Sequence, residues 1–142
     1  MIVKLAEVFF QGSSFNSVLN MSKYETLTKI LDQLRKEAPS KIGRYYPATE
    51  NAETLNQLRA RTFIHLFLKV KFGLTDFQQR ENFITDDTQD GGVDAYYINQ
   101  ENKRIYFIQS KFRTTEANFN SKEILLSELL QMDIDRITMV KS

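Results

Sequence analysis

Apolar side chains recur at helical spacing in the first part of the chain and predict two helices there. Ser22 and Glu25 have the spacing of a capping box, so the first helix begins after Ser22. Pro39 ends it, because proline interrupts helical hydrogen bonding. The apolar positions of this helix are Tyr24, Leu27, Ile30, Leu31 and Leu34.

The longest predicted helix covers residues 51–72 and is closed by Gly73. Basic side chains occupy its other faces, whereas no Asp or Glu occurs between Thr54 and Phe72. The apolar stripe of this helix consists of Leu55, Leu58, Phe63, Leu66, Phe67 and Val70.

Strand-like patterns follow in the second half of the chain. Residues 93–98 and 105–112 predict two strands joined by a turn, and residues 82–85 are a candidate short strand before them. Asn120 and Glu123 repeat the capping-box spacing and open a last apolar helix over residues 124–140. This order of helices and strands predicts a single α/β domain over residues 21–142.

Length and composition restrict the class of protein. A chain of 142 residues is long enough for one domain with one core. No run approaches 18 apolar residues and Glu7 interrupts the apolar start, so neither a transmembrane helix nor a secretory signal is predicted. The lack of cysteine excludes disulfides and thiolate chemistry, and it is consistent with the reducing cytoplasm, where we expect the protein.

Residues 1–20 are weakly patterned. The segment from Ala6 to Ser14 looks like a tag or a protease-site remnant, and Met21 is a natural start. We therefore expect residues 1–20 to be a tag or a poorly ordered leader, although residues 3–10 could equally form a first strand.

Charge is distributed unevenly along the chain, although the formal net charge is only +1. Residues 21–75 contain ten Lys and Arg against five Asp and Glu, whereas residues 76–142 contain eight against twelve. This division suits a protein that binds phosphates with one part and a metal ion with the other. Two solvated faces that happen to differ in sign would give the same counts.

The predicted hairpin carries the candidate chemistry. Matching the apolar faces pairs Ile98 with Ile105, which also places Asp94 opposite Gln109. Opposed Cβ atoms lie roughly 4.5–5.5 Å apart, close enough for the two side chains to share one ion. Lys111 follows on the same face, because side chains alternate along a strand.

These residue types suit metal-assisted attack on a phosphodiester. Mg²⁺ prefers oxygen ligands and keeps several waters, so the Asp94 carboxylate and the Gln109 amide oxygen can suffice beside a substrate phosphate. The ion would polarise the phosphate and activate a bound water. Lys111 would hold that water or stabilise charge on the phosphoryl oxygens. An ordinary cross-strand ion pair between Asp94 and Lys111 is the simpler alternative.

The pattern of Asp94, fourteen residues and then Gln109-Ser110-Lys111 resembles the PD-(D/E)xK nuclease motif in the QxK variant of Mrr-like restriction endonucleases. More closely, ITDDTQDGGVDAYYI followed by IYFIQSKF resembles the N-terminal region of the bacterial abortive-infection phage-resistance (AIPR) family. The resemblance implies a restriction endonuclease-like mixed β-sheet flanked by helices. It also implies a Mg²⁺- or Mn²⁺-dependent endonuclease that cleaves DNA rather than RNA in phage defence.

Carried over by position, the resemblance makes Asp94 and Gln109 metal ligands and Lys111 the catalytic lysine. The family usually places an acid on the first core helix, which this chain lacks. Asp90, Glu81 and Glu53 are candidates for the missing oxygen. His65 also lies near the expected place, but between Leu66 and other apolar neighbours a packed histidine is the more common case.

Several basic side chains are candidate phosphate contacts as a group, although each alone would be an ordinary solvated residue. They are Arg59, Arg61, Lys69, Lys71 and Arg113. A catalytically weak nucleic-acid-binding module and a protein-interaction domain remain alternative functions. Because family members are several times longer, we also expect the chain to be the N-terminal part of a longer protein, or to form a homodimer through residues 124–140.

Overall fold

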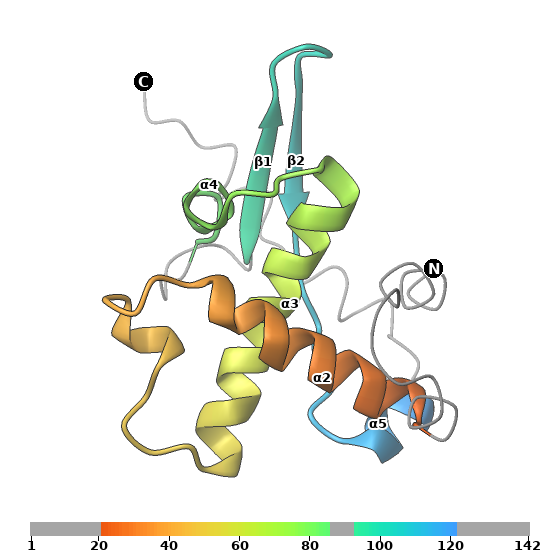
Figure 1. Cartoon of the computed structure of the whole chain (residues 1–142). Helices are drawn as coiled ribbons and strands as arrows, with labels where there is room; N and C mark the ends of the chain where they lie inside the picture. Colours follow the sequence, from red (N-terminus) through yellow and green to blue (C-terminus); the bar gives the residue numbers. More distant parts are fainter. Residues whose placement is uncertain (1–20, 86–92, 122–142) are drawn as a thin grey trace.

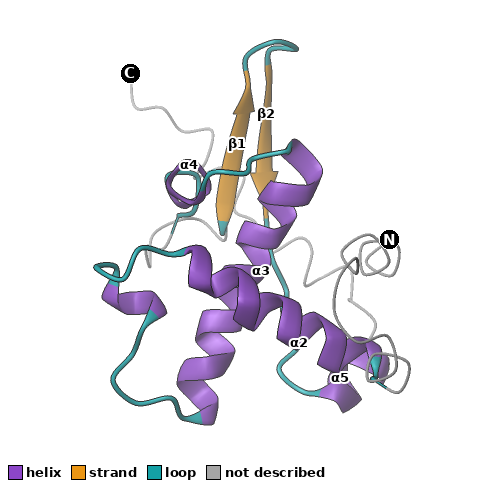
Figure 2. Ribbon diagram, viewed as in Figure 1, coloured by secondary structure: helices purple, strands orange, loops and turns teal. Residues whose placement is uncertain are grey.

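The computed structural model describes residues 21–85 and 93–121. They form an α/β structure of helices with one two-stranded antiparallel sheet (Figure 2), which agrees with the predicted class. The elements are α2 (Lys23–Leu34), η2 (Arg35–Glu37), η3 (Gly43–Tyr45), α3 (Ala52–Phe72), α4 (Phe77–Glu81), β1 (Ala95–Asn99), β2 (Arg104–Ile108) and α5 (Glu116–Ser121), where η denotes a 3₁₀ turn.

Helix α2 begins as predicted. The Glu25 N–H donates to Ser22 Oγ at 3.1 Å, and the Ser22 N–H donates to Glu25 Oε2 at 3.0 Å, which completes the capping box. The helix tightens into η2 after Leu34 and the chain turns before Pro39. Its buried residues pack across α3, which α2 crosses in Figure 1.

Helix α3 also has the predicted ends. Asn51 caps its start, because the Asn51 side chain accepts the Thr54 N–H at 2.9 Å. Gly73 closes it with φ of 69°, the left-handed conformation that favours glycine. The predicted ends of this helix are therefore confirmed.

The buried face of α3 differs from the predicted apolar stripe. Phe67 is exposed, and the other aromatic of that stripe, Phe63, is only half-buried. Thr62 and His65 are buried instead, because each has a hydrogen-bond partner inside the molecule. The Thr62 hydroxyl donates to the Leu58 carbonyl one turn earlier in α3, and His65 meets Tyr45 from η3. The buried side chains of α3 are Leu58, Thr62, Ile64, His65 and Leu68.

The hairpin has the predicted register. Ile98 pairs with Ile105 and Tyr96 pairs with Phe107, but regular pairing stops at Ala95 and Ile108, so the second strand is shorter than predicted. The candidate strand at residues 82–85 is reduced to a single bridge between Ile84 and Ala95. The Tyr96 N–H donates to the carbonyl oxygen of Phe83, the residue before Ile84, at 2.9 Å.

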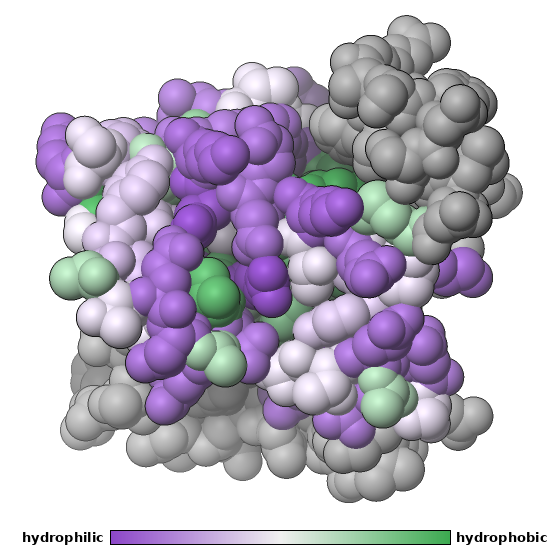
Figure 3. All heavy atoms as spheres, turned by 60° about the horizontal axis from the view of Figure 1, so that its bottom comes forward, coloured by the Kyte–Doolittle hydropathy of each residue, from purple (hydrophilic) through white to green (hydrophobic). Residues whose placement is uncertain are grey.

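The two faces of the hairpin differ in burial. On the inner face the Tyr97 ring stacks on Phe72 from the end of α3, with centroids 4.2 Å apart. On the outer face Ile98, Ile105 and Phe107 are 45%, 59% and 48% exposed. The hairpin extends away from the helices (Figure 1), whereas the helical face in Figure 3 is mostly hydrophilic with small separate apolar patches. The outer face is thus an exposed apolar surface.

Some predictions fall outside the described residues: the leader at 1–20, Asp90, and the apolar helix at 124–140. Asn120 does not open a helix, since it lies within α5, whose start is marked by the Thr115 side chain accepting the Asn118 N–H at 3.2 Å. Among the helices described, none has the length and apolar character needed to cross a membrane.

Candidate active site

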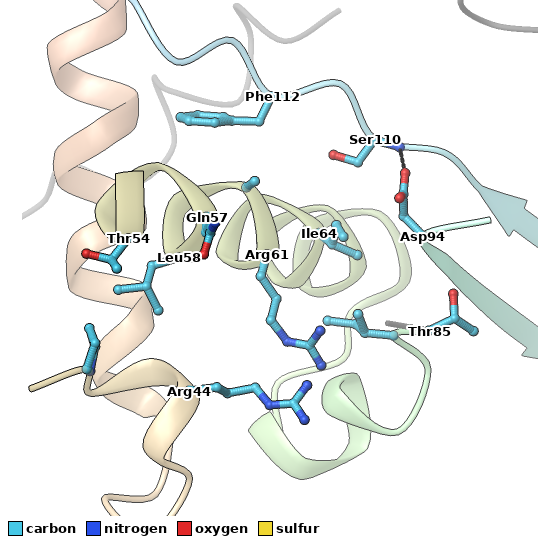
Figure 4. Close-up of a pocket in the computed structure, with 13 residues that line it drawn as sticks. Arg44, Thr54, Gln57, Leu58, Arg61, Ile64, Thr85, Asp94, Ser110 and Phe112 are labelled. Carbon is cyan, nitrogen blue, oxygen red and sulfur yellow. Dashed lines mark hydrogen bonds between the residues drawn. The ribbon is translucent and has the colours of Figure 1, made fainter. Parts of the chain in front are cut away.

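A pocket of about 720 Å³ lies between α3, η3 and the start of β1 (Figure 4). Asp94 and Ser110 line one wall, and Arg44 and Arg61 line the opposite part. The remaining lining includes Thr54 and other residues of α3, together with Pro47, Ile84, Thr85 and Phe112 from the loops around it. One carboxylate and two guanidinium groups therefore share one cavity.

Asp94 is positioned by the irregular end of β1. Its N–H donates to the Ile108 carbonyl at 2.9 Å, and its carbonyl accepts the Thr85 N–H at 3.1 Å. Its carboxylate accepts the Ser110 N–H (Figure 4). The backbone on both sides thus fixes Asp94 at the edge of the pocket.

The structure brings the predicted catalytic residues together only in part. The predicted pairing of Asp94 with Gln109 lies one position beyond the last regular pair, Ala95 with Ile108. In the segment after β2, the described pocket lining includes Ser110 and Phe112, whereas Gln109 and Lys111 alternate with them along the chain. Both of these residues are half-buried and make interactions of their own.

A buried polar cluster that the sequence did not predict adjoins the pocket. It consists of Tyr45 from η3, Arg61 and His65 from α3, and Glu81 from α4. Arg61 Nη2 donates to Glu81 Oε1 at 2.7 Å, and the Tyr45 hydroxyl donates to Glu81 Oε2 at 2.5 Å. Arg61 Nε donates to the Tyr45 hydroxyl at 2.8 Å. The cluster therefore holds the Arg61 side chain that lines the pocket.

Arg80 determines which nitrogen of His65 carries the proton. Arg80 is fully buried, and its Nε lies 3.3 Å from His65 Nδ1. Because a guanidinium can only donate, Nδ1 must accept, so the proton of the neutral ring is on Nε2. His65 Nε2 lies 2.9 Å from Glu81 Oε2 and donates to it. The Phe77 ring, stacked on His65 with centroids 4.7 Å apart, confirms the predicted packed histidine.

Burial and hydrogen bonding shift the pKa values of this cluster. Burial raises the pKa of Glu81, but hydrogen bonds from His65, Arg61 and Tyr45 outweigh it and lower the pKa to about 2. Burial lowers the pKa of His65 below its usual value, against the opposing effect of Glu81. At neutral pH the cluster therefore contains an ionised Glu81 and a neutral His65.

Three of the predicted phosphate contacts pair with carboxylates of the same chain. Arg61 pairs with Glu81, Arg59 donates to both oxygens of Asp32 at 2.9 and 2.7 Å, and Lys69 Nζ lies 2.5 Å from Glu37 Oε1. Of the other two, Lys71 is exposed in the last turn of α3, and Arg113 is half-buried beyond β2. Contact of these five side chains with phosphate stays a prediction.

The donor atoms at Asp94 have the chemistry that Mg²⁺ prefers, since the carboxylate faces a pocket large enough for water and phosphate. Further carboxylates do not converge there: within residues 21–85 and 93–121, no group of three or more His, Asp or Glu side chains could hold a metal ion. Glu81 serves the polar cluster, and Glu53 is exposed in the first turn of α3.

Arg44 and Ser110 are among the pocket residues that had no role in the predicted site. Arg44 comes from a 3₁₀ turn, which gives no periodic signal, and Ser110 was the variable position between Gln109 and Lys111. The polar cluster has one signal in the sequence, because Arg61 and His65 stand four residues apart and so share a helix face.

Comparisons with protein families, curated proteins and solved structures found no match.

Proposed function

We propose that this chain is a restriction endonuclease-like domain that hydrolyses phosphodiester bonds of DNA with Mg²⁺ or Mn²⁺, in bacterial defence against phage. The observation that carries the proposal is the position of Asp94. It stands immediately before β1 on the wall of a pocket, and Arg44 and Arg61 line the same pocket. A carboxylate can bind a metal ion, and guanidinium groups bind phosphate.

In this proposal each residue at the site has a separate role. The Ser110 N–H orients the Asp94 carboxylate, which would hold the ion with the Gln109 amide oxygen. When bound, the ion supplies an activated water and polarises the phosphate. Lys111, two positions beyond Gln109, stabilises charge on the phosphoryl oxygens, and Arg61 is held toward the pocket by Glu81 and Tyr45.

Cleavage of plasmid DNA, single-stranded DNA and RNA, with Mg²⁺ or Mn²⁺ and with a chelator, tests this function. Asp94→Ala and Lys111→Ala should each lower metal-dependent cleavage by at least about 100-fold, since both groups act at the reacting phosphate. Glu101→Ala and Lys41→Ala remove exposed charges of the same signs and should cleave like wild type. Unchanged cleavage by the Asp94 and Lys111 variants would show that the site is elsewhere.

A nucleic-acid-binding module without hydrolysis is the second candidate. It is favoured because α3 carries no acid beyond its first turn, and because no three-residue acidic group forms in the described part of the chain. Such a module would bind DNA with an affinity that falls steeply with salt and would cleave nothing. No binding to DNA, or an affinity that does not change with salt concentration, would instead favour the protein-interaction domain.

We also propose that residues 124–140 form a homodimer contact, as their apolar pattern predicts. Sedimentation velocity at micromolar concentration measures this directly. Leu129→Glu and Leu130→Glu together should convert a dimer to a monomer, and a wild-type protein that is already a monomer would contradict the proposal.

A further inference from the structure

A buried hydroxyl at the pocket has no hydrogen-bond partner within the described part of the chain. The Oγ atom of Ser110 is inaccessible to solvent, and no hydrogen-bonding group among the described residues reaches it. Buried hydroxyls almost always have a partner, because an unpaired one costs about 1–3 kcal/mol of folding free energy. Such an atom in the wall of a cavity indicates a group that binds there.

The surroundings of Ser110 specify the charge of that group. Its own N–H is already used by the Asp94 carboxylate, so only the hydroxyl remains to meet a ligand. In Figure 4 this hydroxyl points toward the pocket, which Arg44 and Arg61 also line. A phosphate has oxygen atoms that accept from a hydroxyl and from guanidinium groups. The two guanidinium groups therefore give this pocket a part that suits a phosphate, beside the Asp94 carboxylate.

We propose that Ser110 is a substrate-binding residue, whose hydroxyl donates to a phosphate oxygen of the nucleic acid bound at this pocket. The inference rests on the proposed function and adds to it a residue outside the predicted catalytic set. It assigns to Ser110 a binding role, distinct from the metal and proton chemistry of Asp94 and Lys111.

Ser110→Ala tests the role with two opposite readouts. The substitution keeps the backbone N–H that holds Asp94 and removes only the hydroxyl. Affinity for a labelled double-stranded oligonucleotide, measured by fluorescence anisotropy with a chelator present, should fall about tenfold. The free energy of unfolding in urea should stay equal or rise, since an unpaired buried group is lost. A hydroxyl with a purely structural role would instead lower stability and leave affinity unchanged.

The salt dependence of binding gives a third readout. A neutral hydroxyl displaces no counterion, so the slope of log affinity against log salt should be the same for Ser110→Ala and wild type. Ser40→Ala, at an exposed position in the loop after Pro39, is the matched control and should bind like wild type. Under Mg²⁺, Ser110→Ala should raise KM and change kcat little.

Competition separates the two sources of phosphate. If a deoxynucleoside 5′-monophosphate at millimolar concentration displaces the oligonucleotide from wild type but not from Ser110→Ala, the pocket binds a single nucleotide unit. If only an unlabelled oligonucleotide competes, a strand is needed, and both results support a phosphate at Ser110. Equal affinity of Ser110→Ala and wild type for DNA overturns the inference, while cleavage by wild type still decides the proposed function. Wild type that binds none of these probes overturns both.

Discussion

Glu81 is the residue on which the polar cluster depends. It accepts hydrogen bonds from a tyrosine, an arginine and a histidine, and its side chain is 13% exposed. A buried carboxylate is stable only when its partners remain in place, and removing its charge takes away the carboxylate that pairs with Arg61. We expect this one residue to affect both stability and the orientation of Arg61.

Glu81→Gln should lower the free energy of unfolding by about 3 kcal/mol at pH 7, because the lowered pKa of Glu81 stores about that much stability. The folded pKa lies below the ordinary Glu value, so this stability is complete above about pH 4.5 and is lost as the pH falls toward 2. Urea unfolding across this range measures it. The variant should show a flatter pH dependence there, whereas Glu101→Gln on the exposed hairpin turn should match wild type.

His65 adds a second pH effect of the same sign. Its pKa is lowered in the folded state, so the unfolded chain binds the proton more tightly below about pH 6.5. Stability therefore decreases as the pH falls below that value. His65→Gln should remove the part of this decrease that sets in as the pH falls below about 6.5, and urea unfolding at fixed ionic strength checks it. A decrease that persists in the variant would point to other groups.

At the scale of the elements, Gly73 fixes where α3 ends and the chain turns toward α4. Its φ of 69° is costly for any residue with a Cβ, although open space surrounds the Cα atom. Gly73→Ala should lower the free energy of unfolding by about 1 kcal/mol. Gly43→Ala is the matched control, because Gly43 has equal space and an ordinary φ, and it should be neutral or stabilising.

Elements with a local signal could be predicted from the sequence. Ser22 with Glu25, and Gly73, mark helix ends through contacts between near neighbours, and matching apolar faces gave the Ile98–Ile105 register. The irregular end of β1 could not be predicted, because it depends on hydrogen bonds to Thr85 and to Ile108 from separate segments. Side-chain alternation then placed Gln109 and Lys111 beside Asp94, whereas the described pocket includes Ser110.

The prediction of the buried face of α3 was wrong for a related reason. Hydrophobic periodicity assumes that buried residues are apolar, but the partners of His65 and Arg61 arrive from Tyr45 and Glu81, far away in sequence. Polar residues with such partners can be buried, because the hydrogen bonds offset the loss of hydration. A pattern confined to one helix contains no information about those partners.

At the scale of the whole molecule, the hairpin presents one packed and one exposed apolar face. Ile105→Ser and Phe107→Ser, on the outer face, should each change the free energy of unfolding by less than about 0.5 kcal/mol. Tyr97→Ser should cost about 2–3 kcal/mol, since its ring stacks on Phe72. Urea unfolding at neutral pH compares them, and a large loss from Ile105→Ser would show that the outer face is covered in solution.

The polar cluster also has a consequence for the order of folding events. Tyr45 and Glu81 are 36 residues apart, so the cluster closes only after η3, α3 and α4 have come together. We expect contacts of such long range to form after the transition state, and contacts of that kind leave the folding rate unchanged and slow unfolding. Loss of the Glu81 charge should therefore leave the slopes of both chevron arms and the folding rate unchanged, and raise the unfolding rate by about 100-fold. The cluster would then determine the lifetime of the folded protein.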